Sequence, residues 1–477
     1  MPGRAKARAG IDVRVEPAAW FVRGRQLSES WNESGTAAAY AALLLRSLGQ
    51  RCVDIDVPSR HPAIAWAHSG AMALTGSSEA EPRMCPVALA SCADAALAAL
   101  ASLAPAGSFG QVDGAALLGE RAAVAGFSRA GLVSSGGACR LLEARDGWLA
   151  VNFPRESDWE LAPAWLEINT VDDWSAVAAR LRDCRSADLV ERARLMGLAV
   201  SAEVEPADST PPWFRQTRLG AQRARGAMAS PLVIDLSTLW AGPLCGHLLQ
   251  QLGATVVKLE SQARPDGARF GPEPFFDLLN AGKSSVALDP KKPAQREALL
   301  ALMHRADIVI ESTRPRALAQ FGIDAATVLR ESPGLSWVSI SGYGRSAPHS
   351  HWAAFGDDAG VAAGLSWLLD AAGSRAFCAD AIADPLTGLH AALAAWSDYL
   401  GGGGHLIALS LRDVVAHCAG FDRPRTRSAI RARASDWSRL AAAAGGAAPP
   451  RARRAQEHAP ALGADTRQWT SRLGVAC

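Results

Sequence analysis

The 477-residue sequence lacks the features that mark several common protein classes. It has no run of about 18 consecutive apolar residues, so a membrane-spanning helix is not expected, and its basic start is not followed by the apolar segment of a signal peptide. Its nine cysteines are scattered without CxxC or Cys/His ligand spacing, which predicts neither a disulfide framework nor a zinc site. The formal net charge of +2 gives no overall field that favours nucleic acid or a membrane surface. We therefore expect a cytoplasmic protein with no metal site, no nucleic-acid partner and no membrane partner.

Two nucleotide-binding patterns are also missing. Gly282-Lys283-Ser284 resembles the end of a phosphate-binding P-loop, but that motif needs a glycine five residues before Gly282, where the sequence has Asp277. The segment after Lys283 alternates small and apolar residues up to Pro290, which predicts a short strand rather than a helix. No GxGxxG follows a predicted strand, so a dinucleotide dehydrogenase is not expected. Lys283 is then either an exposed surface lysine or the partner of a phosphate that a P-loop does not bind.

The second half of the chain predicts an α/β fold. Continuous apolar runs, which are typical of strands buried on both faces, alternate with helical segments at the spacing of βα units. The expected strands are 231–236, 254–260, 284–289, 306–311, 335–341 and 405–411. This order predicts a parallel sheet with flanking helices, in which ligands bind at the carboxyl ends of the strands.

The other parts of the chain show different patterns. A hairpin pattern around Asp146 and two helical stretches after it predict a small α+β domain over residues 111–204. Residues 205–228 are predicted to be a linker. Residues 421–477 are an Arg-, Ala- and Pro-rich tail with a C-terminal segment. We expect this tail to be mobile, and we interpret its basic charge as that of a solvated linker rather than of an RNA-binding surface.

Segments of the two halves of the chain can be aligned. Residues 44–56 match 248–260 as helix, glycine and strand at an offset of 204, and residues 91–100 can be laid on 384–393 at an offset of 293. If both matches hold, the first half lacks about 89 residues (293 minus 204) that the second half contains. The alternative is that helix, glycine and strand is a generic pattern of alanine-rich α/β proteins. Under the first interpretation, residues 15–110 are a shortened, degenerate copy.

Asp384 is the strongest candidate for chemistry. It precedes Pro385 and an apolar helical run, which predicts an N-cap with proline at the first helical position. A structural role would explain this position fully. The same position would keep a nucleophilic carboxylate ionised and point backbone donors at an oxyanion beside it. Gly342 and Gly344 follow a predicted strand, where their N–H groups would face a ligand or form an ordinary turn. The four glycines at 401–404 predict a flexible turn.

Seven motifs between residues 231 and 411 resemble the class III CoA-transferases, the group of carnitine dehydratase-like and formyl-CoA transferase-like proteins. They are "DLSTLWAGP", "LGATVVKLE", "LNAGKSSVALD", "ADIVIESTRP", "FGID", "VSISGYG" and "ADPLTGLHAAL". The resemblance implies a Rossmann-like catalytic domain at 229–420, in which Asp384 attacks an acyl-CoA thioester. CoA then passes through an aspartyl-CoA thioester to a carboxylic acid. CoA would be a substrate rather than a permanently bound cofactor.

The resemblance also implies where CoA binds and where this sequence departs from the family. The implied CoA-binding residues are Trp240, Ala241, Asn280, Ala281, Gly282, Lys283, Ser312, Thr313, Arg314, Ser341, Gly342, Tyr343 and Gly344. Ser261 and Gln320 stand where the family often has arginine. That departure leaves Arg264, Arg269 or Arg314 as the expected phosphate contacts.

Two further functions stay open beside CoA transfer, namely an acyl-CoA epimerase or isomerase of the same family and a non-catalytic acyl-CoA-binding pseudoenzyme. Asp357 stands where related racemases have histidine, which favours CoA transfer over proton-shuttling racemisation. The first half resembles the family loosely, with Ser91 in the place of Asp384, so we expect a fused, degenerate partner. The chain would then be a pseudo-dimer with one CoA site, either monomeric or a homodimer. The sequence names neither the acyl donor nor the acceptor acid.

Overall fold

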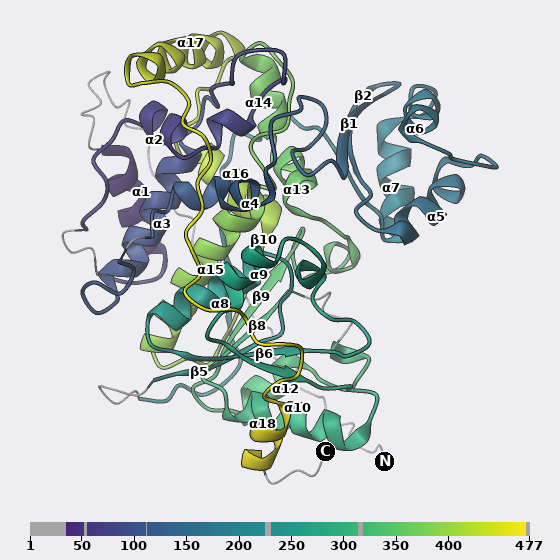
Figure 1. Cartoon of the computed structure of the whole chain (residues 1–477). Coiled ribbons are helices and arrows are strands. Elements are labelled where there is room, and N and C mark those ends of the chain that lie inside the picture. The colour runs from purple at the N-terminus through teal and green to yellow at the C-terminus, as the bar shows by residue number, and fades with distance from the viewer. Residues whose placement is uncertain (1–34, 52–54, 111, 225–229, 313–317, 474–477) are drawn as a thin grey trace, which may run out of the picture. The chain divides into compact units, whose positions relative to one another are not determined.

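Within the described residues, a seven-stranded sheet in the order β4-β10-β9-β8-β5-β6-β7 organises the second half of the chain (Figure 1). The computed structural model describes residues 35–51, 55–110, 112–224, 230–312 and 318–473. The strands are β4 (Arg215–Arg218), β5 (Leu232–Asp235), β6 (Thr255–Glu260), β7 (Ser284–Ala287), β8 (Ile308–Glu311), β9 (Ser336–Ser341) and β10 (His405–Ser410). All run parallel except β4, which pairs antiparallel with β10. The predicted α/β class and its six strands are confirmed.

Helices cover both faces of this sheet (Figure 1). The helices of this half of the chain are α8 (Ala241–Gln251), α9 (Glu273–Asn280), α10 (Pro293–Arg305), α12 (Ala325–Glu331), α13 (Gly356–Ala362), α14 (Leu365–Ala371), α15 (Ala383–Leu400) and α16 (Leu411–Phe421). α8 and α15 pack on one face of the sheet and α10 and α12 on the other, whereas α14 packs against α13 and α17 (Arg427–Ala443). Adjacent residues of a strand lie on opposite faces of the sheet. Val233 packs in the core that includes α8 and α15, whereas Ile234 packs in the core that includes α10 and α12. At Gly388 a Cβ atom would lie 2.7 Å from the carbonyl oxygen of Ala241. This close approach presses the first turn of α8 against α15.

Two connections in the second half differ from the sequence prediction. β4 lies inside residues 205–228, the predicted linker, and forms an edge strand of the sheet. Its four residues are all exposed, so they carry no apolar signal of a strand. The glycines at 401–404 form a fixed turn rather than a flexible one, because the backbone of Gly403 packs directly against that of Gly334.

The first half contributes helices to the same core. They are α1 (Gly35–Ser47), α2 (Pro62–His68), α3 (Leu89–Ser102) and α4 (Glu120–Ala125), with the 3-10 helix η2 (Ala116–Gly119) before α4. α3 packs against α1 and also against α15. α1 and α3 therefore pack together as do α8 and α15, the helices with which they align. The strand expected at 52–56 falls partly on residues 52–54, outside the described residues, and Ile55 and Asp56 are irregular. The repeat itself stays a prediction.

Residues 139–202 form a small domain with its own apolar core. Its antiparallel sheet consists of β1 (Cys139–Ala144), β2 (Gly147–Asn152) and β3 (Ala199–Ala202). Its helices are α5 (Glu156–Leu166), α6 (Trp174–Leu181) and α7 (Ser186–Met196). The predicted hairpin is present, because Ala144 pairs with Gly147 across a tight turn that contains Asp146.

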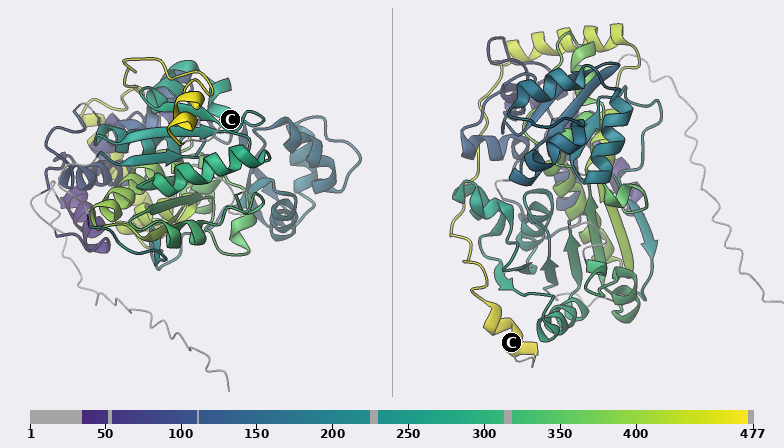
Figure 2. Two further views of the ribbon diagram at one scale, coloured as in Figure 1. Left: turned by 90° about the horizontal axis from the view of Figure 1, so that it is seen from below. Right: turned by 90° about the vertical axis from the view of Figure 1, so that its right-hand side faces the viewer.

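The C-terminal part, which the sequence predicted to be a mobile tail, is ordered. It contains α17 (Arg427–Ala443) and α18 (Thr466–Leu473), joined by an extended segment, residues 444–465, that we call the strap (Figures 1 and 2). Arg453 in the strap forms an ion pair with Glu120 at 2.7 Å. Asp465 accepts a hydrogen bond at 2.8 Å from the backbone N–H of Ser285 in β7. The prediction was wrong because charges that suggest solvation are paired across the fold. None of the helices among the described residues has the length and hydropathy of a membrane span.

Candidate active site

Asp384 lies in the first turn of α15, the central helix of the large core. The helix begins at Ala383 and Ile382 occupies the cap position, so Asp384 is not the N-cap that the sequence predicted. The difference arises because Ile382 already has helical dihedral angles, which starts the helix earlier than Pro385 suggested. Asp384 still lies at the positive end of the helix dipole, where a negative charge is favoured.

Asp384 is also the accessible residue of a buried segment. Every other residue from Ala376 to Tyr399 is buried, whereas Asp384 is half-buried. Ala379 and Ala381, just before the helix, have φ angles of 58° and 42°, in the left-handed region that non-glycine residues rarely adopt. Such conformations persist only where the surrounding structure enforces them, and they are concentrated at functional sites. The strained loop thus presents one carboxylate to solvent.

Backbone atoms surround the Asp384 carboxylate closely. Gly356, the first residue of α13, has no room for a Cβ atom because Asp384 Oδ2 and the carbonyl oxygen of Ala381 occupy that space. The backbone N–H of Ala241, at the start of α8, acts to lower the pKa of this carboxylate. The first turns of three helices therefore meet at Asp384.

One arginine and three aspartates form the charged part of the site. Arg121 of α4 donates from Nε to Asp380 Oδ2 at 2.8 Å and from Nη2 to Oδ1 at 2.5 Å. Asp380 is fully buried. Asp357, next to Gly356, accepts a hydrogen bond at 2.9 Å from the N–H of Ala381. Three carboxylates thus face one guanidinium group, and that guanidinium comes from the first half of the chain.

These surroundings shift the carboxylate pKa values toward neutrality. Burial raises the pKa of Asp384 to about 7, with Arg121 acting in the opposite direction and Asp357 adding to the rise. Burial, and then the charge of Asp380, raises the pKa of Asp357 to about 6. Burial also raises the pKa of Asp358 to about 7. Carboxylates whose pKa values are this strongly perturbed are concentrated at functional sites.

Trp240 forms one wall of the site. Its ring contacts Phe275 edge-on with centroids 5.3 Å apart, and the Arg121 guanidinium lies 5.5 Å from its centroid. The side chain is buried, and its Nε1–H has no hydrogen-bond partner among the described residues. A buried donor without a partner is costly, and this indole N–H is such a donor beside Asp384's charged neighbour Arg121.

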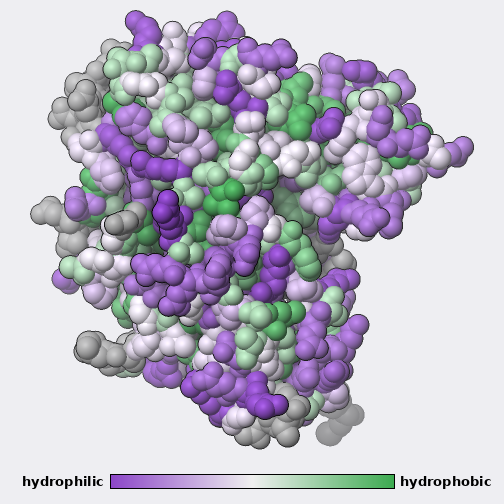
Figure 3. Space-filling model, in the orientation of Figure 1, coloured by the Kyte–Doolittle hydropathy of each residue, from purple (hydrophilic) through white to green (hydrophobic). Residues whose placement is uncertain are grey.

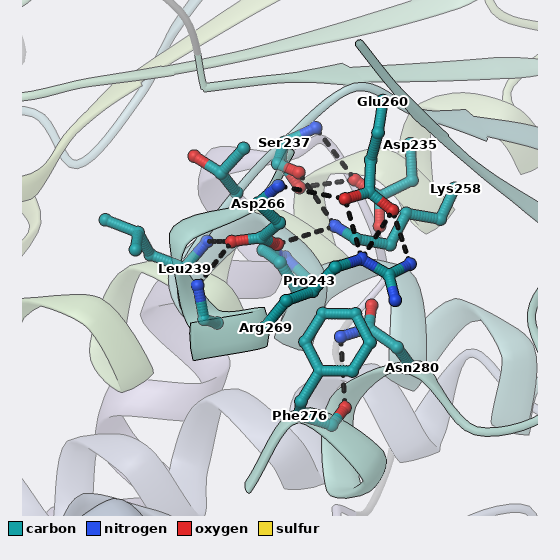
Figure 4. A network of polar contacts seen from close by, with 12 residues as sticks. Asp235, Ser237, Leu239, Pro243, Lys258, Glu260, Asp266, Arg269, Phe276 and Asn280 are labelled. Atoms are coloured by element: carbon teal, nitrogen blue, oxygen red, sulfur yellow. Dashed lines mark hydrogen bonds and ion pairs between the residues drawn. The ribbon is translucent and has the colours of Figure 1, made fainter. Parts of the chain in front are cut away.

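The loop that carries Trp240 is held by a buried ionic network (Figure 4). Leu239 has a φ angle of 68°, and its N–H donates to Asp266 Oδ1 at 2.9 Å. The other oxygen of Asp266 forms an ion pair with Lys258 at 2.7 Å. Lys258 also donates to the carbonyl oxygen of Ser237 at 3.0 Å. The network stabilises the left-handed turn that directs the loop to Asp384.

Lys283 belongs to the same buried layer. Its ammonium group donates to Asp235 Oδ2 at 2.9 Å, to the Pro243 carbonyl oxygen at 2.9 Å and to Asn280 Oδ1 at 3.1 Å. An ammonium group has three N–H donors, so all are used. The side chain is 1% exposed. The structure therefore places Lys283 neither on the surface nor with a donor free for a CoA phosphate.

The other predicted CoA residues fall into separate groups. Thr238, beside Trp240, donates its N–H to Ser312 Oγ at 3.0 Å, which joins the ends of β5 and β8. Thr313 and Arg314 lie outside the described residues. Ser341 Oγ accepts the N–H of Gly344 at 3.0 Å, and thereby closes a turn at the end of β9.

Of the expected phosphate-binding arginines, Arg269 is already paired with a carboxylate of the protein. It forms a bidentate ion pair with Glu260, the shortest bond being 2.6 Å. Arg264 is exposed. A phosphate contact by Arg269 is therefore not supported by its position.

Two clefts contain parts of the predicted CoA set. One, of about 1220 Å³, includes Ala281, Gly282, Gln250 of α8, Glu120 of α4 and strap residues 451–457. The surface along the strap is largely hydrophilic (Figure 3). The other cleft, of about 520 Å³, includes Tyr343, Gly344, Arg345, Arg412 and Trp213. These two clefts therefore contain different parts of the predicted CoA set, and Asp384 lines neither of them.

Arg121 and Asp380 are the site residues that sequence reasoning missed. Their contact joins positions 259 residues apart, and the segment around Arg121 has no motif. Asp380 did carry a local signal, since it lies four residues before Asp384 in "CADAIADPL".

The sheet and the Asp384 site define an α/β protein with a half-buried carboxylate at the start of its central helix. The model of CoA-transferase family III matches residues 229–470, more than half of the sequence, and the chain belongs to this family. Acetyl-CoA:oxalate CoA-transferase from Acetobacter aceti is 30% identical over 139 residues, 28% of this chain and 36% of that protein. Formyl-CoA:oxalate CoA-transferase from Escherichia coli O6:H1 is 28% identical over 206 residues, 39% of this chain and 49% of that protein.

Among solved structures, a CAIB/BAIF family protein from Brucella suis is 25% identical at a TM-score of 0.35, over 46% of this chain and 58% of that one. The chain spans about a third to a half of the length of the curated relatives that it matches.

Proposed function

We propose that this protein is a CoA-transferase that moves CoA from an acyl-CoA to a carboxylic acid, with Asp384 as the nucleophile. The observation that carries the proposal is the position of Asp384. It is the accessible residue of an otherwise buried segment, and it lies where the first turns of α8, α13 and α15 meet. Membership of CoA-transferase family III gives the reaction class.

The proposed chemistry exchanges carboxylates on one thioester. An oxygen of the Asp384 carboxylate attacks the thioester carbonyl carbon, the C–S bond breaks, and CoA leaves as the thiolate with a mixed anhydride on Asp384. The thiolate then attacks the Asp384 carbonyl carbon, which releases the first acid as its carboxylate and leaves an aspartyl-CoA thioester. The acceptor carboxylate repeats these steps in reverse. No net proton transfer is needed, so a carboxylate nucleophile suits the reaction.

The surroundings of Asp384 support this role. A carboxylate that is partly removed from water is a stronger nucleophile than a fully hydrated one, and the raised pKa reports this partial removal. The N–H of Ala241, which acts to lower the pKa of the carboxylate, would stabilise the oxyanion that forms when Asp384 itself is attacked. The unpartnered Nε1–H of Trp240 is a second donor beside the same loop.

For CoA we propose a path along the loop between β5 and α8. The thioester end would meet Trp240 and Ala241, and the nucleotide would occupy the larger cleft at Ala281 and Gly282. Lys283 and Asn280 would not contact CoA but would stabilise the loop through their buried hydrogen bonds. The turn from Ser341 through Gly342 to Tyr343 and Gly344 remains a proposed contact of the acyl group.

The experiment is an exchange assay with labelled CoA. The wild-type protein should move label from an acyl-CoA to a series of carboxylic acids, and Asp384→Asn should fall to about a hundredth of that rate or less. Exchange of the α-proton with solvent in place of CoA transfer would instead identify an acyl-CoA epimerase or isomerase. Binding of acyl-CoA without either reaction would identify a pseudoenzyme.

A further inference from the structure

We propose that Arg121 binds the carboxylate of each acid as it leaves and enters, so that the first half of the chain completes the active site. The inference rests on the proposed CoA transfer. It extends that proposal by naming the group that holds the second substrate and the half of the chain that supplies it.

The first support is the geometry of the guanidinium. Asp380 occupies the edge formed by Nε and Nη2, at 2.8 and 2.5 Å. Among the described residues, none forms a hydrogen bond with Nη1, which carries two further N–H groups. The side chain is 28% exposed, so this free end is not sealed in the core. One edge of Arg121 is thus anchored and the other is available to a ligand.

The second support is the rigidity of this arrangement. The guanidinium lies 5.5 Å from the Trp240 ring centroid and 5.7 Å from that of Phe127. The preceding residue, Glu120, receives bonds of 2.7 Å from both Nε and Nη2 of Arg453 in the strap. Because both the side chain and its helix are fixed, little ordering remains to be done when a carboxylate binds.

The third support is the charge balance of the reaction. Each acid leaves or arrives as a carboxylate and must reach the Asp384 carbonyl carbon, close to Asp357 and Asp380. The charge of the incoming carboxylate and the charges of these aspartates repel each other, and burial strengthens the repulsion. Arg121 acts on both Asp384 and Asp357. A guanidinium that offers two parallel N–H groups is well matched to a carboxylate. Without it, the second substrate would enter a site of uniform negative charge.

The test compares Arg121→Gln with a matched control in the same half. Arg60 forms an equivalent ion pair with a buried carboxylate, Asp94, and its exposed fraction of 22% is close to that of Arg121. Arg60→Gln therefore controls for the loss of a half-buried ion pair. Both variants are assayed for CoA transfer with the acceptor acid and the acyl-CoA varied separately.

We expect Arg121→Gln to raise KM for the acceptor acid by about ten- to a hundredfold, the scale of one lost charge-assisted hydrogen bond. KM for the acyl-CoA should change far less, and added guanidinium chloride at low concentration should restore part of the activity, unlike sodium chloride. The acid limb of the pH profile should move to higher pH, because Arg121 holds the pKa of Asp384 down against burial. If Arg121→Gln does not fold, the Arg121→Lys variant tests the proposal in its place. It keeps the charge and hence the acid limb, but should still raise the acceptor KM.

The two proposals fail in different ways. Absence of labelled-CoA exchange in the wild-type protein overturns the proposed function. An active wild-type protein, together with an Arg121→Gln variant that behaves like Arg60→Gln in acceptor KM, guanidinium response and pH profile, overturns the role of Arg121 alone.

Discussion

Replacing Lys283 with methionine should destabilise the fold rather than selectively weaken CoA binding. The substitution keeps most of the side-chain volume and removes three hydrogen bonds, including the one to Asp235, which is 0% exposed. Breaking a buried ion pair from one side costs about 3–5 kcal/mol, because the remaining charge stays buried without its partner. Although burial alone would raise it, the pKa of Asp235 is lowered, because Lys283 and Lys258 both stabilise the carboxylate. Since Lys258 remains, we expect the lower end, about 3 kcal/mol.

Urea unfolding followed by tryptophan fluorescence measures this loss. Lys291→Met is the matched control, since Lys291 is exposed, and it should change the free energy of unfolding by less than about 0.5 kcal/mol. The double variant Lys283→Met/Asp235→Asn should lose less than the sum of the two single variants, because the residues share one interaction.

Calorimetric titration with CoA and with a pantetheine-length analogue separates the two roles of Lys283. Lys283→Met should weaken both ligands equally, because it acts through the loop that the lysine holds. A variant of unchanged stability that loses affinity for CoA and not for the analogue would refute this reasoning. It would place Lys283 on a nucleotide phosphate, as the resemblance implied.

Two further predictions concern stability. Asp384→Asn should melt above the wild-type protein at pH 8 and show a smaller difference at pH 4. The folded protein keeps a proton on Asp384 up to about pH 7, whereas an unfolded aspartate releases it near pH 3.9. The stability of the wild-type protein therefore falls as the pH rises through this window. Equal differences in melting temperature between the variant and the wild type at both pH values would contradict the raised pKa. Arg453→Gln should lower the free energy of unfolding by about 3 kcal/mol because it leaves a buried carboxylate unpaired, while Arg454→Gln, an exposed neighbour in the strap, should have little effect in the same urea assay.

The strands and the nucleophile candidate could be predicted because their signals are local. β5, β6 and β8 are buried on both faces, so each appears in the sequence as a continuous apolar run. Asp384 stands before a proline and an apolar helical segment, which places it at a helix start to within one residue. Periodicity and capping chemistry were sufficient for these features.

The remaining features depend on partners that are distant in the sequence. Lys283 was expected near solvent because lysine is rarely buried, and its partner Asp235 lies 48 residues away. The composition of residues 444–465 is that of a mobile segment, yet its charges are paired with carboxylates of the first half. Arg121 lies in a short helix without a motif, 259 residues from Asp380. No local pattern encodes these pairings, so only the folded chain reveals them.

The most direct test of the account is the mass of the protein after reaction with an acyl-CoA in the absence of an acceptor. The wild-type chain should gain the mass of CoA less one water, the adduct should map to Asp384, and hydroxylamine should remove it and leave an inactive hydroxamate at that position. Asp384→Asn should gain nothing, whereas Asp398→Asn, altered at a buried carboxylate near the other end of α15, should still form the adduct. Turnover without an adduct on Asp384, or an adduct on another residue, would contradict covalent catalysis by this carboxylate.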